Sequence, residues 1–153
     1  MEEPLLRPGV PGEEKRLSDL CLRSKAYWGY DLDFLEACRG PLSIGTAGLM
    51  AGHVTVCEAR DKMLLGVCEV SPGSEYGNLE KLFIDPDAIG RGIGRILFET
   101  AKAQLKALGE KKMTILSDPF AEPVYVHWGA RRVRMKPSEV FEGRELPWME
   151  MEL

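Results

Sequence analysis

The chain has 153 residues, of which 44% are hydrophobic and 29% are charged, and its formal net charge is −4. This length and composition are typical of one globular domain with a sizeable core. The acidic balance argues against a protein that binds nucleic acid through a broadly basic face. No apolar run approaches the length of a membrane span, and the N-terminal Met-Glu-Glu-Pro lacks an apolar signal region, so a cytoplasmic protein is expected.

The four cysteines, Cys21, Cys38, Cys57 and Cys68, include no CxxC pair. Two fall in expected helices and two in expected strands, which is typical of reduced, buried thiols rather than of disulfides. With only two histidines in the chain, no metal site is expected.

The first half of the chain is expected to combine helices with a strand hairpin. The apolar spacing over residues 13–28 predicts a helix that ends at Gly29, and Asp31 is placed to cap a second, shorter helix. The expected order is a strand at 5–8, helices at 13–28 and 32–38, and strands at 53–58 and 63–70 joined by a turn at 60–62.

The second half begins with a strand, a glycine-rich turn and a strongly patterned helix. Residues 93–108 carry one apolar stripe, and Gly109 stands where a C-terminal cap is expected. The order predicts an α/β protein, an α+β mixed sheet with helices on its faces rather than a doubly wound parallel sheet. The stripe is Ile93, Leu97, Ala101, Leu105 and Leu108, and the other expected elements are strands at 79–84, 113–116, 130–135 and 146–153 and a helix at 121–128.

The turn between strand 79–84 and helix 93–108 contains Gly90, Gly92 and Gly94. Glycine lets backbone N–H groups approach a ligand closely, and a helix start adds unpaired N–H groups and the positive end of its dipole. The turn therefore predicts an anion site, most naturally for a pyrophosphate.

Three segments in this order resemble the GNAT superfamily (GCN5-related) of acetyl-CoA-dependent N-acetyltransferases. They are Leu-Glu-Lys-Leu-Phe-Ile-Asp-Pro at 79–86, Gly-Arg-Gly-Ile-Gly at 90–94 and Tyr-Val-His-Trp-Gly at 125–129, and residues 23–30 resemble an uncharacterised bacterial branch. The resemblance implies the GNAT acyl-CoA N-acyltransferase fold, with a central, mostly antiparallel sheet flanked by helices, in a single domain over 1–153. It also implies acetyl-CoA (coenzyme A) as cosubstrate, no metal, and direct attack by a primary amine.

The resemblance further implies roles for individual residues. The backbone of Leu82, Phe83 and Ile84 is expected to run along the pantetheine arm, in a cleft between strands 79–84 and 113–116, with one N–H polarising the thioester carbonyl; the three side chains are expected mainly in the core. Tyr125 is the candidate general acid toward the thiolate. The expected pyrophosphate loop is Gly90, Arg91, Gly92, Ile93, Gly94 and Arg95.

Glu80 is the candidate general base, because a carboxylate among apolar neighbours suits proton acceptance near neutrality. The alternatives are an ordered water as base and a surface Glu80 paired with Lys81 or another cation. Tyr27, Trp28 and Tyr30 are expected to cover the acceptor, a small-molecule or peptide amine, although aromatics in this position also serve to pack helices on a sheet.

Three positions depart from the family pattern: Ile89 replaces a Gln or Arg of the loop, Asp118 an Asn, and Ala130 an aromatic residue. Two other functions remain open at this stage, a non-catalytic coenzyme A-binding sensor or structural module and a nucleotide-binding protein. A homodimer is expected if the terminal strand 146–153 leaves an open sheet edge.

Overall fold

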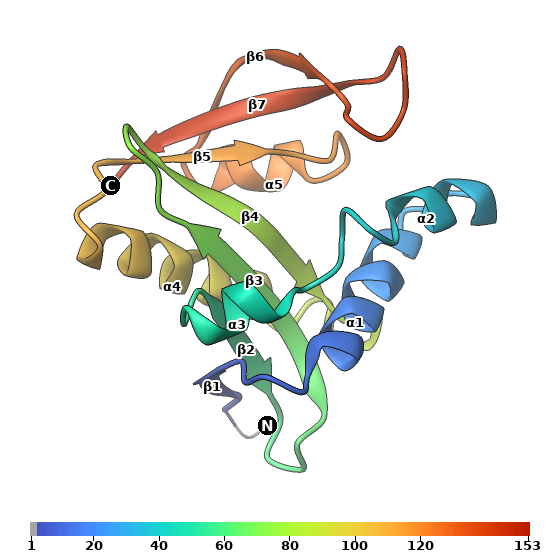
Figure 1. The fold of residues 1–153 in the computed structure, drawn as a ribbon, viewed down its shortest axis with the longest axis vertical. Helices are drawn as coiled ribbons and strands as arrows, with labels where there is room; N and C mark the ends of the chain where they lie inside the picture. Colours follow the sequence, from blue (N-terminus) through green and yellow to red (C-terminus); the bar gives the residue numbers. More distant parts are fainter. Residues whose placement is uncertain (1–2) are drawn as a thin grey trace. The chain divides into compact units, whose positions relative to one another are not determined.

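Residues 3–153 are described by a computed structural model, shown in Figure 1, and residues 1–2 lie outside the description. The chain forms two units. Unit 1 comprises the residues up to Glu69 together with Lys81–Thr100, and unit 2 comprises Val70–Glu80 together with Ala101–Leu153.

Seven strands form a sheet in the order β1-β2-β3-β4-β5-β7-β6. β4 and β5 pair in parallel, whereas the β1–β2, β2–β3, β5–β7 and β6–β7 pairs are antiparallel. The mixed sheet expected from the sequence is therefore confirmed. The strands are β1 (Leu5–Pro8), β2 (Val54–Glu58), β3 (Leu64–Ser71), β4 (Gly77–Ile84), β5 (Lys112–Leu116), β6 (Arg131–Pro137) and β7 (Glu145–Glu152).

The helices begin and end close to the expected residues. Asp31 caps α2 by accepting the N–H of Phe34 at 2.8 Å, and Gly109 follows α4 in the left-handed conformation, with φ at +89°. One short helix, α3, is not predicted, because five residues are too few to show an apolar period. The helices are α1 (Glu14–Ala26), α2 (Leu32–Cys38), α3 (Thr46–Met50), α4 (Ile93–Ala107) and α5 (Glu122–His127), with a 3₁₀ turn, η1, at Pro86–Ala88.

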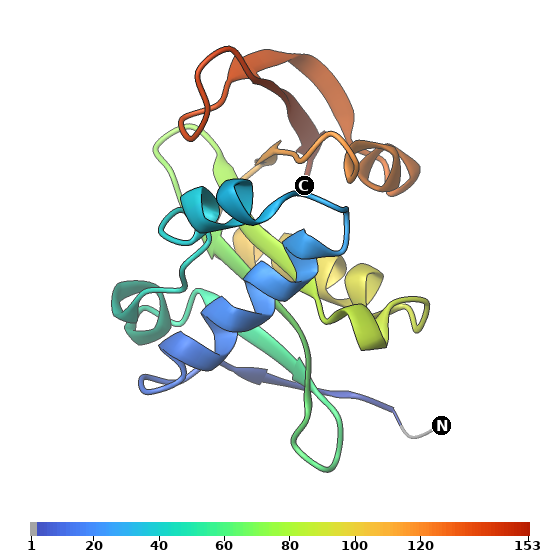
Figure 2. The same ribbon diagram turned by 90° about the vertical axis from the view of Figure 1, so that its right-hand side faces the viewer.

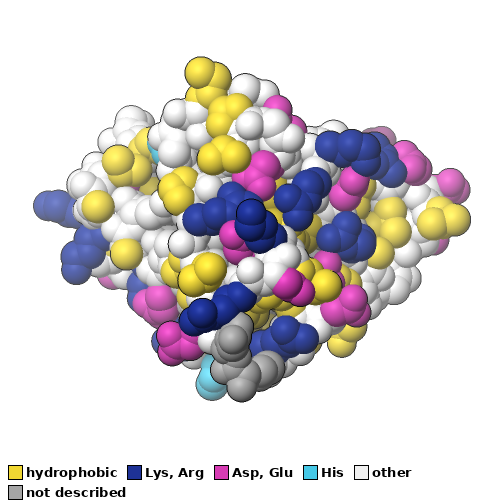
Figure 3. All heavy atoms as spheres, turned by 90° about the horizontal axis from the view of Figure 1, so that it is seen from below, with side chains coloured by type: hydrophobic (Ala, Val, Ile, Leu, Met, Phe, Trp, Pro, Cys, Tyr) yellow, Lys and Arg dark blue, Asp and Glu magenta, His cyan; other side chains and the backbone are white. Residues whose placement is uncertain are grey.

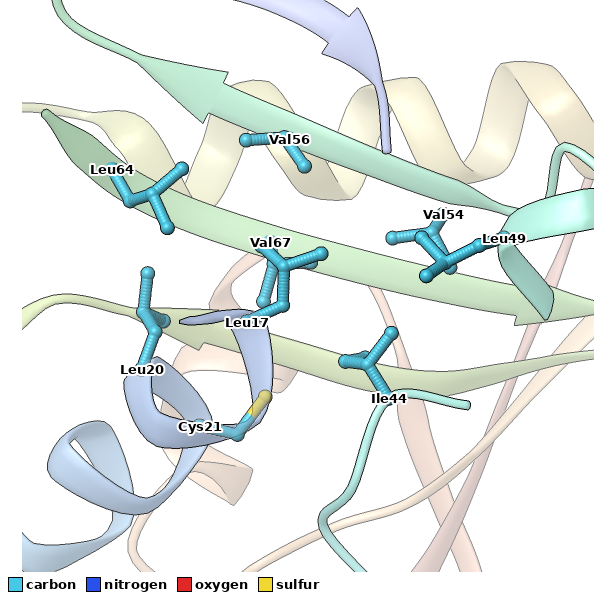
Figure 4. Close-up of a cluster of buried hydrophobic side chains, with 9 residues drawn as sticks. All are labelled: Leu17, Leu20, Cys21, Ile44, Leu49, Val54, Val56, Leu64 and Val67. Carbon is cyan, nitrogen blue, oxygen red and sulfur yellow. The ribbon is translucent and has the colours of Figure 1, made fainter. Parts of the chain in front are cut away.

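In unit 1, α1 and α3 cover one face of the strands β2 and β3. Figure 2 shows α1 crossing in front of these strands, and Figure 4 shows the buried side chains between the layers. Phe83 of β4 packs against the same cluster. The cluster consists of Leu17, Leu20, Cys21, Ile44, Leu49, Val54, Val56, Leu64 and Val67.

On the opposite face of β3 from this cluster, Gly66 leaves space for the start of α4. A Cβ at Gly66 would lie 2.8 Å from Leu97 Cδ1, 3.0 Å from Ile84 Cδ1 and 3.1 Å from Ile93 Cγ2. The missing side chain therefore lets the first turns of α4 and the end of β4 meet against β3. The apolar stripe of α4 is confirmed except at Leu108, which is 54% exposed because the helix ends at Ala107.

Unit 2 contains β5, β7 and β6 with α5. β7 lies between β5 and β6, so the expectation that the terminal strand forms the sheet edge is wrong. The outer strand is β6, which carries a register shift between Arg132 and Arg134 and ends at Pro137. Bulges, basic side chains and proline are the features that protect an edge strand from pairing with a second chain. The terminal strand therefore has no open edge for a second chain, and the homodimer stays a prediction.

All four cysteines are free and buried, as expected. Burial raises the pKa of the Cys21 and Cys68 thiols to about 12 and also raises the pKa of the Cys57 thiol. Because the thiolate is the nucleophilic form, these three side chains are unsuited to nucleophilic catalysis.

Candidate active site

The loop before α4 has a backbone that requires glycine at two positions. Gly90 and Gly92 adopt left-handed conformations, with φ at +89° and +78°. A Cβ at either position would meet no atom of residues 3–153 within 4 Å, so the backbone conformation rather than crowding selects glycine here. Gly94 already belongs to α4.

This loop presents a row of backbone donors. In the described part of the chain, the N–H groups of residues 90–94 have no hydrogen-bond acceptor, and the first bond of α4 runs from the Ile96 N–H to the Gly92 carbonyl at 3.2 Å. The helix that follows has 15 residues, so the positive end of its dipole adds to the row. The arrangement fits an anion such as a pyrophosphate.

Three side chains at the loop, those of Ile89, Arg91 and Arg95, are exposed. Arg91 is exposed, and Arg95 forms an ion pair with Glu99 at 3.0 Å. Ile89, where the family pattern has Gln or Arg, is 46% exposed and offers no polar atom from its side chain. The donors for an anion at this loop are therefore mainly backbone amides, with Arg91 as the nearest cation in the sequence.

The end of β4 leads into this loop. Leu82, Phe83 and Ile84 are half-buried, so the expectation that they are core side chains holds only in part. The parallel register of β4 with β5 covers Gly77–Met113 and Asn78–Thr114, at the start of the strand. Strand residues beyond this register need other partners for the backbone groups on that side.

The N–H of Ile84 finds its partner in a helix. It donates to Ser24 Oγ of α1 at 3.3 Å, while the next residue, Asp85, donates its N–H to the Leu65 carbonyl of β3 at 2.8 Å. Arg23, beside Ser24, forms an ion pair with Asp85 at 2.9 Å. The contacts of Ser24 and Arg23 are not predicted from the sequence, because no motif links residues 60 positions apart.

In unit 2, Tyr125 lies on α5 and is 7% exposed. Its ring meets the ring of Trp128 edge to face, with centroids 5.9 Å apart. The Tyr125 carbonyl accepts the N–H of Ala130 at 3.0 Å, and Gly129 closes the turn in the left-handed conformation. The tyrosine therefore has a fixed backbone and a ring held by an aromatic neighbour.

Glu80, also in unit 2, is exposed and accepts a hydrogen bond from the Ser71 hydroxyl at 2.5 Å. Its expected alternative partner, Lys81, is bound elsewhere: the Lys81 ammonium lies 3.0 Å from Glu69 Oε1 in a largely buried ion pair. Glu80 is therefore a surface residue, as the alternative predicted, but its pairing with Lys81 is wrong, and its carboxylate has a hydroxyl neighbour.

The three aromatic residues expected to cover the acceptor form two pairs in unit 1. The exposed rings of Tyr27 and Trp28 meet edge to face at 5.4 Å, whereas Tyr30 stacks on Phe34 at 4.2 Å. The buried Lys25 ammonium lies 5.1 Å from the centre of the Tyr30 ring. The region thus combines aromatic surface with a cation.

The loop, the end of β4 and the aromatic pairs belong to unit 1, and Tyr125 and Glu80 belong to unit 2. Figure 3 shows lysine and arginine side chains interspersed with carboxylates on the face that it draws. Among residues 3–153, no three or more His, Cys, Asp or Glu side chains gather as a metal site. Over the same range, no helix combines the length and apolarity needed to cross a membrane.

Solved structures show the same fold. A GCN5-related N-acetyltransferase from Rhodopseudomonas palustris superposes with a TM-score of 0.79 at 18% identity, covering 100% of this chain and 98% of that one. PaiA N-acetyltransferase from Thermoplasma acidophilum, in complex with coenzyme A, gives 0.77 at 15% identity, covering 99% and 100%. The ribosomal-protein-S18-alanine N-acetyltransferase from Escherichia coli gives 0.69 at 14% identity, covering 97% and 93%.

No curated protein sequence matches the chain significantly. The family model of the acetyltransferase (GNAT) domain, however, matches residues 47–153, which include β4, the glycine loop, α4 and α5. The chain therefore belongs to the GNAT acetyltransferase family and is an acyltransferase.

Proposed function

We propose that the protein moves an acetyl group from acetyl-CoA to a primary amine by direct attack of that amine on the thioester. The observation that carries the proposal is the row of N–H groups at residues 90–94 that have no acceptor among residues 3–153, on two left-handed glycines and the start of a 15-residue helix. The structure from Thermoplasma acidophilum, of the same fold, holds coenzyme A. A pyrophosphate suits such a row of amides.

The cofactor-binding residues we propose lie on two consecutive segments. The backbone of Leu82, Phe83 and Ile84 faces the pantetheine arm, and residues 90–95 hold the pyrophosphate. The donors at the loop are the amides of Gly90, Arg91, Gly92, Ile93 and Gly94, joined by the side chains of Arg91 and Arg95. Acetyl-CoA supplies the activated acetyl group.

The chemistry requires two proton transfers. The acceptor ammonium must lose a proton before its nitrogen forms the new C–N bond, and the thiolate that leaves with the broken C–S bond must gain one. We assign the first to Glu80, with an ordered water as the alternative base, and the second to Tyr125. The burial of Tyr125 against Trp128 supports its assignment, because a fixed ring holds its hydroxyl in one direction.

The acceptor class stays broad, a small-molecule or peptide amine covered by Tyr27, Trp28 and Tyr30. We further propose that the two units work as one domain, since β4 and α4 each contribute residues to both. Four buried free thiols support a cytoplasmic location. The homodimer is a proposal for sedimentation analysis to test.

The direct test incubates the protein with acetyl-CoA and a panel of amines: polyamines, amino acids, aminoglycosides and peptides with free N-termini or lysines. Release of free thiol together with an acceptor heavier by one acetyl group supports the proposal. Binding of acetyl-CoA without thiol release for any amine supports the non-catalytic coenzyme A-binding module instead.

A further inference from the structure

We propose that Ser24 is a cofactor-positioning residue. Its hydroxyl oxygen accepts the Ile84 N–H, and its proton is donated to a carbonyl oxygen of the pantetheine arm of acetyl-CoA. The inference rests on the proposed function and adds to it a side chain of α1, an element to which the sequence analysis assigns no cofactor contact.

The direction of the Ile84 N–H follows from that of its neighbour in the strand. Successive backbone N–H groups of a strand point to opposite sides. Asp85 donates its N–H to the Leu65 carbonyl of β3 at 2.8 Å, so the N–H of Ile84 points away from β3. It meets Ser24 Oγ at 3.3 Å. One of the three backbone amides expected along the pantetheine arm is thus already engaged by a serine.

The Ser24 hydroxyl also has a proton to donate. A serine hydroxyl has one donor and two acceptor positions. Within residues 3–153, the Ser24 side chain accepts the Ile84 N–H, and its own proton has no acceptor. The side chain is half-buried at the edge of the strand segment that leads into the loop. Because the Ile84 N–H is used by Ser24, the Ser24 hydroxyl becomes the donor that is offered to the ligand in its place.

Ser24 is held in place before any ligand binds. Its neighbour Arg23 binds Asp85, so two consecutive residues of the last turn of α1 hold two consecutive residues at the end of β4. A chain of N–H, hydroxyl and ligand carbonyl polarises each bond in it, which strengthens the last one. A donor that is already held in position improves affinity, because little conformational entropy is lost when the ligand binds.

The test compares two ligands by isothermal titration calorimetry. Acetyl-CoA contains the pantetheine arm, and 3′-phospho-ADP is the remainder of the molecule without it. Ser24→Ala should weaken acetyl-CoA binding by roughly fivefold, the effect of one hydrogen bond, and leave 3′-phospho-ADP binding unchanged. Ser24→Thr keeps the hydroxyl and should retain the affinity for both ligands.

Ser18→Ala is the matched control. Ser18 lies on the same helix, and its Oγ accepts the N–H of Ile44 at 2.9 Å, so its loss removes the same kind of bond. It should lower the melting temperature without changing either affinity. If Ser24→Ala does not fold, Ser24→Cys takes its place, since a thiol is a poorer donor, and the same selective loss is expected.

Three results overturn the inference. Unchanged or tighter acetyl-CoA binding in Ser24→Ala would mean that Ile84 serves the ligand directly. An equal loss for both ligands would mean that the substitution disturbs the loop. A wild-type protein that binds neither ligand would remove the proposed function itself, an outcome distinct from the other two.

Discussion

The guanidinium of Arg23 donates to a single carboxylate oxygen of Asp85, from Nη2 at 2.9 Å and from Nε at 3.3 Å. The other oxygen of Asp85 accepts the N–H of Asp87 at 3.0 Å and so caps the 3₁₀ turn η1. One carboxylate therefore connects the last turn of α1, the end of β4 and the turn that precedes the glycine loop.

Asp85→Asn and Asp85→Ala separate these two contacts. Asparagine retains an oxygen for the Asp87 N–H and loses the ion pair, which is screened because the Arg23 side chain is 51% exposed. We expect a loss of about 0.5 kcal/mol in the free energy of unfolding for Asn and about 1 kcal/mol more for Ala, measured by urea denaturation. Equal losses in the two variants would show that the cap contributes nothing.

The stability of unit 1 depends on pH through the protonation of the Glu13 carboxyl. Hydrogen bonds from Arg7, at 2.7 and 2.8 Å, hold the pKa of the Glu13 carboxyl below its ordinary value, with a further contribution from the Val10 N–H. A depressed folded-state pKa means that the stabilisation is complete above the unfolded-state value of about 4.5 and is lost as the pH falls through the folded-state value.

Glu13→Gln should therefore lower the free energy of unfolding by about 2 kcal/mol at neutral pH, and the difference from wild type should shrink at acidic pH. Chemical denaturation at a series of pH values measures it. Glu36→Gln, which removes a fully exposed pair with Arg39, should leave the profile nearly unchanged. A Glu13→Gln difference that stays constant with pH would contradict the account.

Tyr125→Phe should lower kcat by about a hundredfold, because the leaving thiolate loses its acid, while acetyl-CoA affinity stays within about twofold. Steady-state kinetics and calorimetry separate the two quantities. Tyr76→Phe is the control, since Tyr76 is another tyrosine of unit 2 with an edge-to-face aromatic neighbour, Trp148. An unchanged kcat in Tyr125→Phe removes Tyr125 from the mechanism.

Glu80→Gln should change the pH–rate profile, because an amide cannot take the proton of the acceptor ammonium. Glu75→Gln, at another exposed position of unit 2, should leave the wild-type profile unchanged. A profile for Glu80→Gln that matches wild type would assign proton removal to an ordered water or another group.

Local signals in the sequence predict local structure well in this chain. Asp31 caps α2, Lys62 turns the β2–β3 hairpin with φ at +70°, and Gly92 precedes α4 in the left-handed conformation. Each depends on one residue and its immediate neighbours, which is the information that a single sequence contains.

The sequence does not predict which distant strands and side chains pair. The position of β7 inside the sheet depends on which strands pair, and an apolar pattern does not specify the neighbour. The contacts of Ser24 with Ile84 and of Ser71 with Glu80 likewise join elements through single side chains. No spacing rule identifies them, so the candidate site gains Ser24 only from the structure.

The central claim is that residues 90–94 bind the pyrophosphate of acetyl-CoA. Its most direct test is isothermal titration of acetyl-CoA into wild type, Gly92→Val and Gly143→Val. Gly92 and Gly143 have similar left-handed φ values, +78° and +81°, and open space around a Cβ, so both substitutions carry a similar backbone strain of about 1–2 kcal/mol. We predict micromolar binding in wild type and Gly143→Val and none in Gly92→Val. Absence of binding in wild type, or undiminished binding in Gly92→Val, would contradict the account.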